Sequence, residues 1–136
     1  MKVFTNGCFD VLHRGHIEIL KYCASLGDVT VGLNSDSSVS RLKGSSRPLV
    51  SEQDRKKILE SIKYVGSVHI FDEDTPYELI KTLRPDLIVK GGDYKAEEVA
   101  GFDLCEVRIF NTVEGYSSSE LINRISKSNV IQLDRE

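Results

Sequence analysis

The chain has 136 residues, of which 40% are hydrophobic and 29% are charged, and its formal net charge is -3 at pH 7. This length and this composition are typical of one globular domain with its own core and argue against a disordered chain. The small negative charge does not favour bulk attraction to nucleic acid or to an anionic membrane, so an anionic ligand would need local positive groups.

The cysteine content and the hydropathy favour a cytoplasmic protein. Three cysteines without paired spacing do not suggest a disulfide framework, so a reducing compartment is expected. Residues 1–4 form too short an apolar run for a signal peptide, and no stretch approaches the length of a membrane span. We expect one domain over residues 1–128, followed by a C-terminal tail over residues 129–136.

Five short apolar runs are predicted as strands, and four segments with helical spacing are predicted as helices. The strands are expected at residues 2–5, 28–33, 67–71, 86–90 and 105–110. The helices are expected at residues 17–26, 51–63, 75–84 and 117–127. Ser51 and Ser117 are the expected N-caps of two helices, each with an acidic residue three positions later, and Thr75 is expected to cap another with Pro76 at its first position.

The alternation of strands and helices predicts an α/β fold, a Rossmann-like three-layer α/β/α arrangement with a mainly parallel five-stranded sheet. Residues 34–46 are polar and rich in Ser and Gly, so we expect a loop there with one helical turn around residues 38–42. In such sheets, ligands bind beyond the carboxyl ends of the strands. The loops expected at those ends are residues 6–16, 34–47, 91–94 and 114–119.

The stretch from Thr5 to His16 passes from the first strand through a loop with two glycines into a helix. Backbone N–H groups and the positive end of a helix dipole suit an anion at such a junction. His13 and His16 add side-chain donors on one side of the helix start. We interpret this loop as a cradle for the phosphates of a nucleoside triphosphate. A metal pair would need a third ligand, and His69 lies on a separate strand; a purely structural role for the histidines is the other alternative.

Two motifs resemble those of the nucleotidyltransferases of the cytidylyltransferase-like superfamily. His13-Arg14-Gly15-His16 fits the HxGH signature, and the preceding Asn6-Gly7-Cys8-Phe9-Asp10 fits the G-x-F-D sequence that leads into it. Glu114-Gly115-Tyr116-Ser117-Ser118-Ser119 resembles the second signature, often written ISSTxIR. The two motifs lie at opposite ends of the chain, in the expected order.

Within that superfamily, nearly the whole chain resembles the heptose 1-phosphate adenylyltransferases. The most specific part of this resemblance is the run Lys90-Gly91-Gly92-Asp93-Tyr94. Glycerol-3-phosphate cytidylyltransferases are similar up to Asp36, but they commonly have a Gly-Asp-Asp-Trp-like segment at this place. They also commonly have Arg-Thr-Glu-Gly where this chain has Thr112-Val113-Glu114-Gly115, without the arginine.

The resemblance implies that residues 1–128 form a nucleotidyltransferase domain that transfers AMP from ATP to D-glycero-β-D-manno-heptose 1-phosphate. The products would be ADP-heptose, used for a bacterial cell-surface glycan, and pyrophosphate. Mg²⁺ would bind with the triphosphate, and a homodimer is usual among similar proteins. The alternatives are a cytidylyltransferase for glycerol 3-phosphate or another polyol phosphate, and a regulatory module that binds a nucleotide without chemistry.

Such a reaction needs alignment and positive charge rather than a general base, because the attacking phosphate is already ionised at neutral pH, its second pKa being about 6. The expected catalytic residues are His13, His16, Lys43 and Arg55. The expected nucleotide-binding residues are Asn6, Gly7, Cys8, Phe9, His13, His16, Gly91, Asp93, Tyr94, Ser117 and Ser118. The expected acceptor-binding residues are Asp10, Lys43 and Lys90.

Several of these residues have alternative interpretations. Asp10 could orient a histidine, contact the metal ion or fix the loop, and the sequence does not distinguish these roles. A thiol nucleophile at Cys8 is disfavoured, because no order of Cys and His residues supports one. The basic residues Arg41, Lys43 and Arg47 lack interleaved aromatic residues, so a nucleic-acid surface is not expected.

Overall fold

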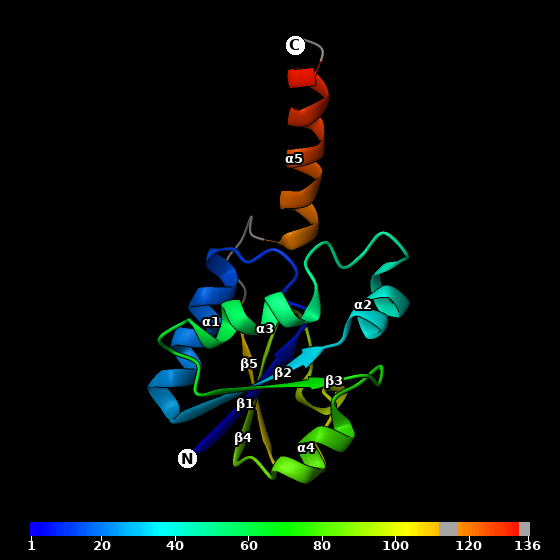
Figure 1. The fold of residues 1–136 in the computed structure, drawn as a ribbon. Helices are drawn as coiled ribbons and strands as arrows, with labels where there is room; N and C mark the ends of the chain where they lie inside the picture. Colours follow the sequence, from blue (N-terminus) through cyan, green and yellow to red (C-terminus); the bar gives the residue numbers. More distant parts are fainter. Residues whose placement is uncertain (112–116, 134–136) are drawn as a thin grey trace.

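In a computed structural model, which describes residues 1–111 and 117–133, the chain folds around a five-stranded sheet with the strand order β3-β2-β1-β4-β5. Every neighbouring pair of strands is parallel. The predicted α/β fold with a parallel five-stranded sheet is therefore confirmed (Figure 1). The strands are β1 (Lys2–Gly7), β2 (Asp28–Asn34), β3 (Ser67–Phe71), β4 (Leu87–Gly91) and β5 (Glu106–Phe110).

Helices cover both faces of this sheet and give the expected three layers. They are α1 (Arg14–Leu26), α2 (Asp36–Lys43), α3 (Glu52–Glu60), α4 (Tyr77–Leu83) and α5 (Ser118–Leu133), with a short 3-10 helix η1 (Ala96–Glu98). In the structure, α1 and α3 pack on one face, whereas α4 packs on the other. In Figure 1, α5 projects away from the sheet. None of the helices in the described part of the chain is long and apolar enough to cross a membrane.

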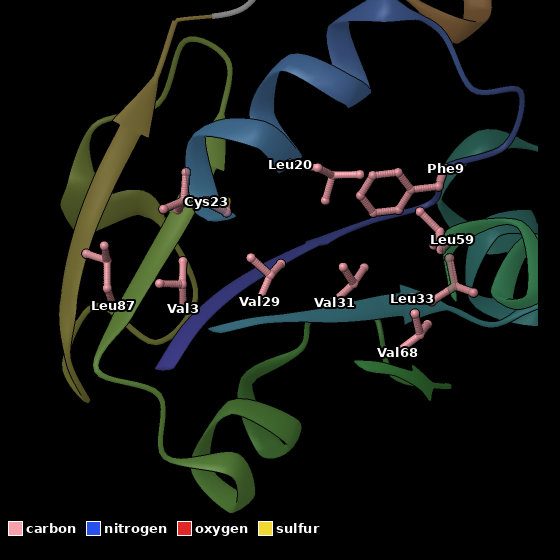
Figure 2. Close-up of a cluster of buried hydrophobic side chains, with 11 residues drawn as sticks. Val3, Phe9, Leu20, Cys23, Val29, Val31, Leu33, Leu59, Val68 and Leu87 are labelled. Carbon is pink, nitrogen blue, oxygen red and sulfur yellow. The ribbon is translucent and has the colours of Figure 1, made fainter. Parts of the chain in front are cut away.

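The two faces of the sheet carry separate buried clusters because successive strand side chains point in opposite directions. Val3 of β1 belongs to the larger cluster, which also contains Leu20 of α1 and Leu59 of α3 (Figure 2). The next residue, Phe4, packs with Ile80 of α4 in the smaller cluster. This central strand is paired with β2 and β4 on its two sides, so the loop that follows Gly7 starts from the middle of the sheet.

Segment 36–43 is a complete helix, where we expected a loop with one helical turn. The side chain of Ser35 caps it by accepting a hydrogen bond from the Ser38 amide at 3.1 Å. Asp36 lies in its first turn and Lys43 in its last turn, which suits the helix dipole. Val39 supplies its fully buried apolar contact. Val39 and the exposed Leu42 are too few apolar side chains in a polar segment to indicate this helix.

Other helix ends also differ from the prediction, and α1 begins at Arg14 rather than at residue 17. Ser51 caps α3 as expected, but the helix ends at Glu60 rather than Lys63, because shorter turns follow it. Helix α4 begins after Pro76 without a side-chain cap, so the expected cap by Thr75 is not formed. Helix α5 continues through residues 129–133, which we had assigned to a tail. Residues 134–136 lie outside the described part of the chain.

Candidate functional site

A cavity of about 710 Å³ opens at the carboxyl ends of the parallel strands. Its volume is typical of a site for a small molecule. Loops or helix ends that follow all five strands contribute to its wall. The predicted site residues that line it are Asn6, Gly7, Cys8, Phe9, Asp10, His13, His16, Lys43, Lys90, Gly91, Tyr94, Ser117 and Ser118. Two predicted residues, Arg55 and Asp93, are not among its lining residues.

The side chains of His13 and His16 cap the N-terminus of α1 by accepting hydrogen bonds from backbone amides of the same turn. The Nδ1 atom of His13 accepts a hydrogen bond from the Gly15 amide at 3.0 Å. The Nδ1 atom of His16 accepts one from the His13 amide at 3.2 Å. The two rings stack, with 4.0 Å between their centroids. Since Nδ1 is an acceptor in both neutral rings, each ring carries its proton on Nε2 and is a donor there.

Both imidazoles are uncharged at neutral pH. Burial lowers the pKa of His16 to about 4, and the neighbouring His13 disfavours its cation further. Burial also lowers the pKa of His13. The pair therefore offers oriented N–H donors to an anion, without fixed positive charges.

The loop between β1 and α1 has an uncommon backbone. Phe9 has φ +48° and Val11 has φ +88°, in the left-handed region that bulky and β-branched residues rarely adopt. Each such residue costs about 1–3 kcal/mol and persists only where its surroundings impose it. The Phe9 ring is buried and lies 5.2 Å from the His16 ring, centroid to centroid. Contacts outside the loop must therefore hold it in shape.

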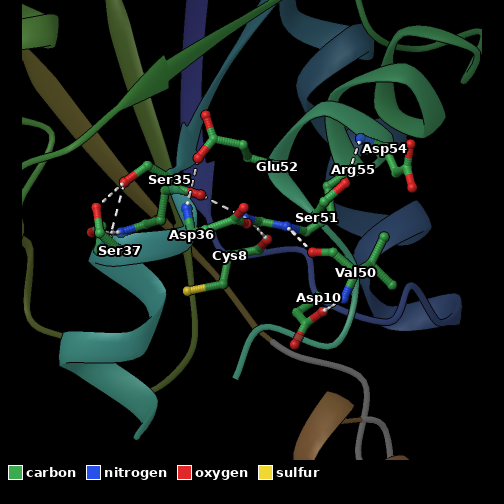
Figure 3. A network of polar contacts seen from close by, with 12 residues as sticks. Cys8, Asp10, Ser35, Asp36, Ser37, Val50, Ser51, Glu52, Asp54 and Arg55 are labelled. Atoms are coloured by element: carbon green, nitrogen blue, oxygen red, sulfur yellow. Dashed lines mark hydrogen bonds and ion pairs between the residues drawn. The ribbon is translucent and has the colours of Figure 1, made fainter. Parts of the chain in front are cut away.

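Asp10 supplies one of those contacts. Its buried carboxylate accepts hydrogen bonds from the Leu49 amide at 2.9 Å and from Arg47 Nε at 2.7 Å. It also accepts one from the Val50 amide at 2.9 Å (Figure 3). Burial alone would raise the pKa of Asp10, but these hydrogen bonds outweigh it and lower the pKa below its usual value. We expected Asp10 to bind the acceptor. Of the three roles left open by the sequence, its contacts support fixing the loop.

Arg55 supplies a further contact, and its position corrects our expectation that it neutralises phosphate charge in the cavity. It is 1% exposed, and four of its five N–H groups donate within the protein (Figure 3). The acceptors are the carbonyl oxygens of Cys8, Asn34 and Val50, at 2.7–2.8 Å, and Asp36 Oδ1 at 2.9 Å. Burial of an arginine in the polar first turn of a helix has no signature in the sequence.

Lys43 and Lys90 bring positive charge to the cavity, together with Arg47. Lys43 is exposed at the end of α2, and Lys90 lies near the end of β4 with its Nζ atom 5.4 Å from the centroid of the Tyr94 ring. Burial lowers the pKa of Lys90, and Lys43 lowers it further, while Cys8 acts in the opposite direction. Asp93 follows in the same segment but is exposed and lies outside the cavity lining.

Cys8 does not have the features of a nucleophile. Burial raises the pKa of its thiol, although Lys43, Arg55, Arg47 and Lys90 act in the opposite direction. The thiol is therefore protonated at neutral pH. Among the described residues, no group of three or more His, Cys, Asp and Glu side chains could hold a metal ion.

The start of α5 is hydrogen-bonded to the loop between β1 and α1, which we call the histidine loop. Ser118 Oγ donates to the Val11 carbonyl oxygen at 2.7 Å, and Ser117 Oγ accepts from the Glu120 amide at 3.1 Å, as expected of a cap. The N-terminal end of α5 therefore reaches the cavity. Residues 112–116 lie outside the described part of the chain. Glu114, Gly115 and Tyr116 of the second signature are among them.

Sequence reasoning missed several cavity residues. Arg47 was noted only for its charge, but its side chain is 12% exposed and joins Asp10 to Ser119 Oγ, the latter at 3.4 Å from its Nη1 atom. The other missed residues follow β3 or β4 and include Asp74, Thr75, Pro76, Glu98, Val99 and Ala100. The sequence could have indicated these residues by their position after predicted strands, because the carboxyl ends of parallel strands meet at one edge of the sheet.

Comparison with known proteins gives relatives along most of the chain. It is 55% identical over 129 residues to bifunctional protein HldE of Syntrophotalea carbinolica, covering 90% of this chain and 26% of the relative. It is 54% identical over 125 residues to bifunctional protein HldE of Nitratiruptor sp., covering 90% of this chain and 27% of the relative. The chain thus spans about a quarter of the length of these curated relatives.

A solved structure has the same fold. The lipopolysaccharide core biosynthesis protein from Thermoplasma volcanium GSS1 superposes with a TM-score of 0.69 at 27% sequence identity, over 86% of this chain and 98% of that protein. The model of the cytidylyltransferase-like family matches residues 4–124, which include both histidines and the start of α5. The resemblance seen in the sequence is confirmed, and the chain belongs to the cytidylyltransferase-like family of nucleotidyltransferases.

Proposed function

We propose that the chain transfers AMP from ATP to D-glycero-β-D-manno-heptose 1-phosphate and releases pyrophosphate. The observation that carries this proposal is the pair of neutral, stacked histidines that cap α1 inside the cavity. The run from Lys90 to Tyr94, which resembles the heptose enzymes, borders the same cavity through Lys90, Gly91 and Tyr94. The similarity to a lipopolysaccharide core biosynthesis protein supports a sugar phosphate as acceptor.

In the proposed reaction, a phosphate oxygen of the acceptor attacks the α-phosphorus of ATP. The new P–O bond forms in line with the bond to the β-phosphate, which breaks, and pyrophosphate leaves without a covalent enzyme intermediate. The acceptor phosphate is already ionised near neutral pH, since its second pKa is about 6. The protein therefore contributes alignment and stabilisation of charge.

The cavity offers suitable groups for this task. His13 and His16 would donate from Nε2 to phosphate oxygens, and Lys43 and Lys90 would balance the negative charge. The N-terminus of α5, with Ser117, would add donors to the outer phosphates. Arg55 and Asp10 would act indirectly, by holding the loop that carries the histidines and the nucleoside-binding residues.

Mg²⁺ fits this arrangement as part of the substrate. Asp10 is the carboxylate within the histidine loop, and it already accepts hydrogen bonds from Arg47 and from two backbone amides. The described residues also provide no group of three His, Cys, Asp or Glu side chains for an ion. The ion would thus be held mainly by the phosphates of ATP, whose charge it would partly neutralise.

Pyrophosphate release tests the proposed function. The full chain is incubated with Mg²⁺, with ATP or CTP, and with heptose 1-phosphate or glycerol 3-phosphate, in all combinations. We expect release with ATP and heptose 1-phosphate. Release with CTP and glycerol 3-phosphate alone would replace our proposal with the cytidylyltransferase alternative. Nucleotide binding without release from any pair would indicate the regulatory module.

A further inference from the structure

The cavity has a second wall that the proposed reaction has not used. It consists of Asp74, Thr75 and Pro76, which precede α4, and of Glu98, Val99 and Ala100, in and after η1. We call these six residues the α4 wall. The inference below rests on the proposed function, because it concerns the acceptor of that reaction.

The two segments of the α4 wall are fastened together. Tyr77 Oη donates to Asp103 Oδ2 at 2.7 Å, which joins the first residue of α4 to the turn after η1. Val99 belongs to the same buried cluster as Ile80 of α4. Gly101 lies so close to this cluster that a Cβ atom there would be 2.7 Å from an Ile88 methyl carbon. The wall is thus anchored to the face of the sheet opposite to α1.

Among the described residues that line the cavity, the acidic side chains other than Asp10 belong to the α4 wall. The two histidines belong to α1, on one face of the sheet, and Lys43 and Lys90 come from the ends of α2 and β4. The α4 wall instead carries the Asp74 and Glu98 carboxylates together with the Thr75 hydroxyl. Carboxylates repel a phosphate, but they are strong acceptors for hydroxyl donors.

We propose that the α4 wall binds the hydroxyl groups of the acceptor sugar, so that Asp74, Thr75 and Glu98 select a phosphorylated compound with a polyhydroxylated, uncharged body. The acceptor phosphate then faces Lys43 and Lys90, and its hydroxyl groups donate to the wall. Pro76, Val99 and Ala100 supply apolar surface for the C–H groups of the same body. The wall therefore decides which acceptor is used, whereas the histidine loop serves any triphosphate.

Existing contacts of the wall disfavour a cationic acceptor such as a phosphorylated amino alcohol. Asp74 Oδ1 already pairs with Arg41 Nε at 2.9 Å, so its negative charge is partly balanced. The Tyr94 ring, which also lines the cavity and could attract a cation, already lies beside the Lys90 ammonium group. A second cation would be repelled by both basic side chains.

Calorimetry of acceptor binding tests the inference. The full chain is saturated with Mg²⁺ and a non-hydrolysable ATP analogue and titrated with heptose 1-phosphate, glycerol 3-phosphate or phosphocholine. The variants are Glu98→Ala and Thr75→Val, and the matched control is Glu97→Ala, which removes a neighbouring exposed carboxylate outside the cavity lining. Each variant is also titrated with the ATP analogue alone.

We expect Glu98→Ala to weaken heptose 1-phosphate binding about 10-fold, as for loss of one charge-assisted hydrogen bond, and Thr75→Val to weaken it about 3-fold. Glu97→Ala and the affinity for the ATP analogue should stay within 2-fold of the wild type. Glycerol 3-phosphate, with fewer hydroxyl groups, should lose less affinity than heptose 1-phosphate in Glu98→Ala.

Equal heptose 1-phosphate affinity in Glu98→Ala and Glu97→Ala would overturn the inference, as would no binding of heptose 1-phosphate to the wild type or tighter binding of phosphocholine. If the affinities follow the expected pattern but no pyrophosphate is released, the proposed reaction is rejected and the sugar site is retained. Release that is unaffected by Glu98→Ala, at any acceptor concentration, would retain the reaction but reject the site.

Discussion

His16 uses the two nitrogen atoms of one ring for different tasks. Its Nδ1 atom accepts the hydrogen bond from the His13 amide and thereby caps α1. This bond fixes the proton on Nε2, the donor assigned to phosphate in the proposed reaction. The structural interpretation of this histidine applies to Nδ1 and the proposed function to Nε2, and an alanine substitution would remove both nitrogen atoms together.

Two substitutions separate these tasks. In His16→Asn, the amide oxygen takes the place of Nδ1 and keeps the cap, but the Nε2 donor is lost. We expect turnover to fall about 10²-fold or more, as for loss of one oriented donor to developing charge. In His16→Gln, the longer side chain can return an N–H group near the Nε2 position, so turnover should fall less. Initial rates of pyrophosphate release measure both effects.

The free energy of unfolding, measured with urea, provides the control for this pair. His16→Asn should stay close to the wild type, because its side chain still caps α1, whereas His16→Gln should lose about 1 kcal/mol with the cap. Unchanged turnover in His16→Asn, with the fold intact, would show that the Nε2 proton has no part in the reaction.

At the scale of elements, Arg55 of α3 joins the other parts of the chain that position the site. Its guanidinium group binds the Cys8 carbonyl after β1, the Asn34 carbonyl at the end of β2 and Asp36 at the start of α2. A cation in the first turn of a helix opposes the helix dipole. This placement is tolerated because four acceptors surround the buried group, so Arg55 is a positioning residue.

Replacement of Arg55 by lysine should therefore loosen these elements. A lysine retains the charge but cannot reach four acceptors in the planar geometry of a guanidinium group. We expect Arg55→Lys to lower the free energy of unfolding by about 2 kcal/mol or more, because buried carbonyl oxygens lose their donors at a cost of about 1–3 kcal/mol each. Nucleotide affinity should fall as well, because Cys8 and Phe9 lose their support. Urea unfolding and calorimetry measure the two effects.

Asp36→Asn is the matched control, since it weakens one of the four contacts at a carboxylate that is 44% exposed. It should cost less than about 1 kcal/mol. If Arg55→Lys instead keeps its stability and loses only turnover, Arg55 acts directly on phosphate and our assignment of a positioning role is wrong.

The sequence predicts the elements better than it predicts the contacts between them. Five short apolar runs, separated by helical segments, identify all five strands, because buried parallel strands need continuous hydrophobic side chains. Helix α2 is missed because its stability comes from the Ser35 cap and one buried Val39 rather than from periodic apolar residues. The role of Arg55 is misjudged, and the α4 wall is missed, for another reason. Their roles depend on which strands are neighbours, and local patterns do not contain that information.

At the scale of the whole molecule, several buried ionisable groups make stability depend on pH in the same direction. The pKa of His16 falls from 6.5 to about 4 in the folded protein, and that of His13 also falls. Between pH 6.5 and 4 the unfolded chain therefore binds more protons than the folded one. The pKa of Asp10 is also lowered, from 3.8, so the folded carboxylate stays ionised where the unfolded one is protonated. In each case the free energy of unfolding decreases as the pH falls.

We therefore expect the nucleotide-free protein to lose stability progressively from pH 7 to pH 4, and further below pH 4 as Asp10 takes part. His16→Asn removes one of these titrations, so the variant, which is close to the wild type in free energy of unfolding at pH 7, should become the more stable of the two as the pH falls from 6.5 to 4. Urea unfolding at several pH values in this range measures the difference in free energy of unfolding between the two proteins. A difference that stays constant would mean that His16 is protonated equally well in both states. His16 would then keep its usual pKa in the folded protein, and burial would not be what makes it a neutral donor.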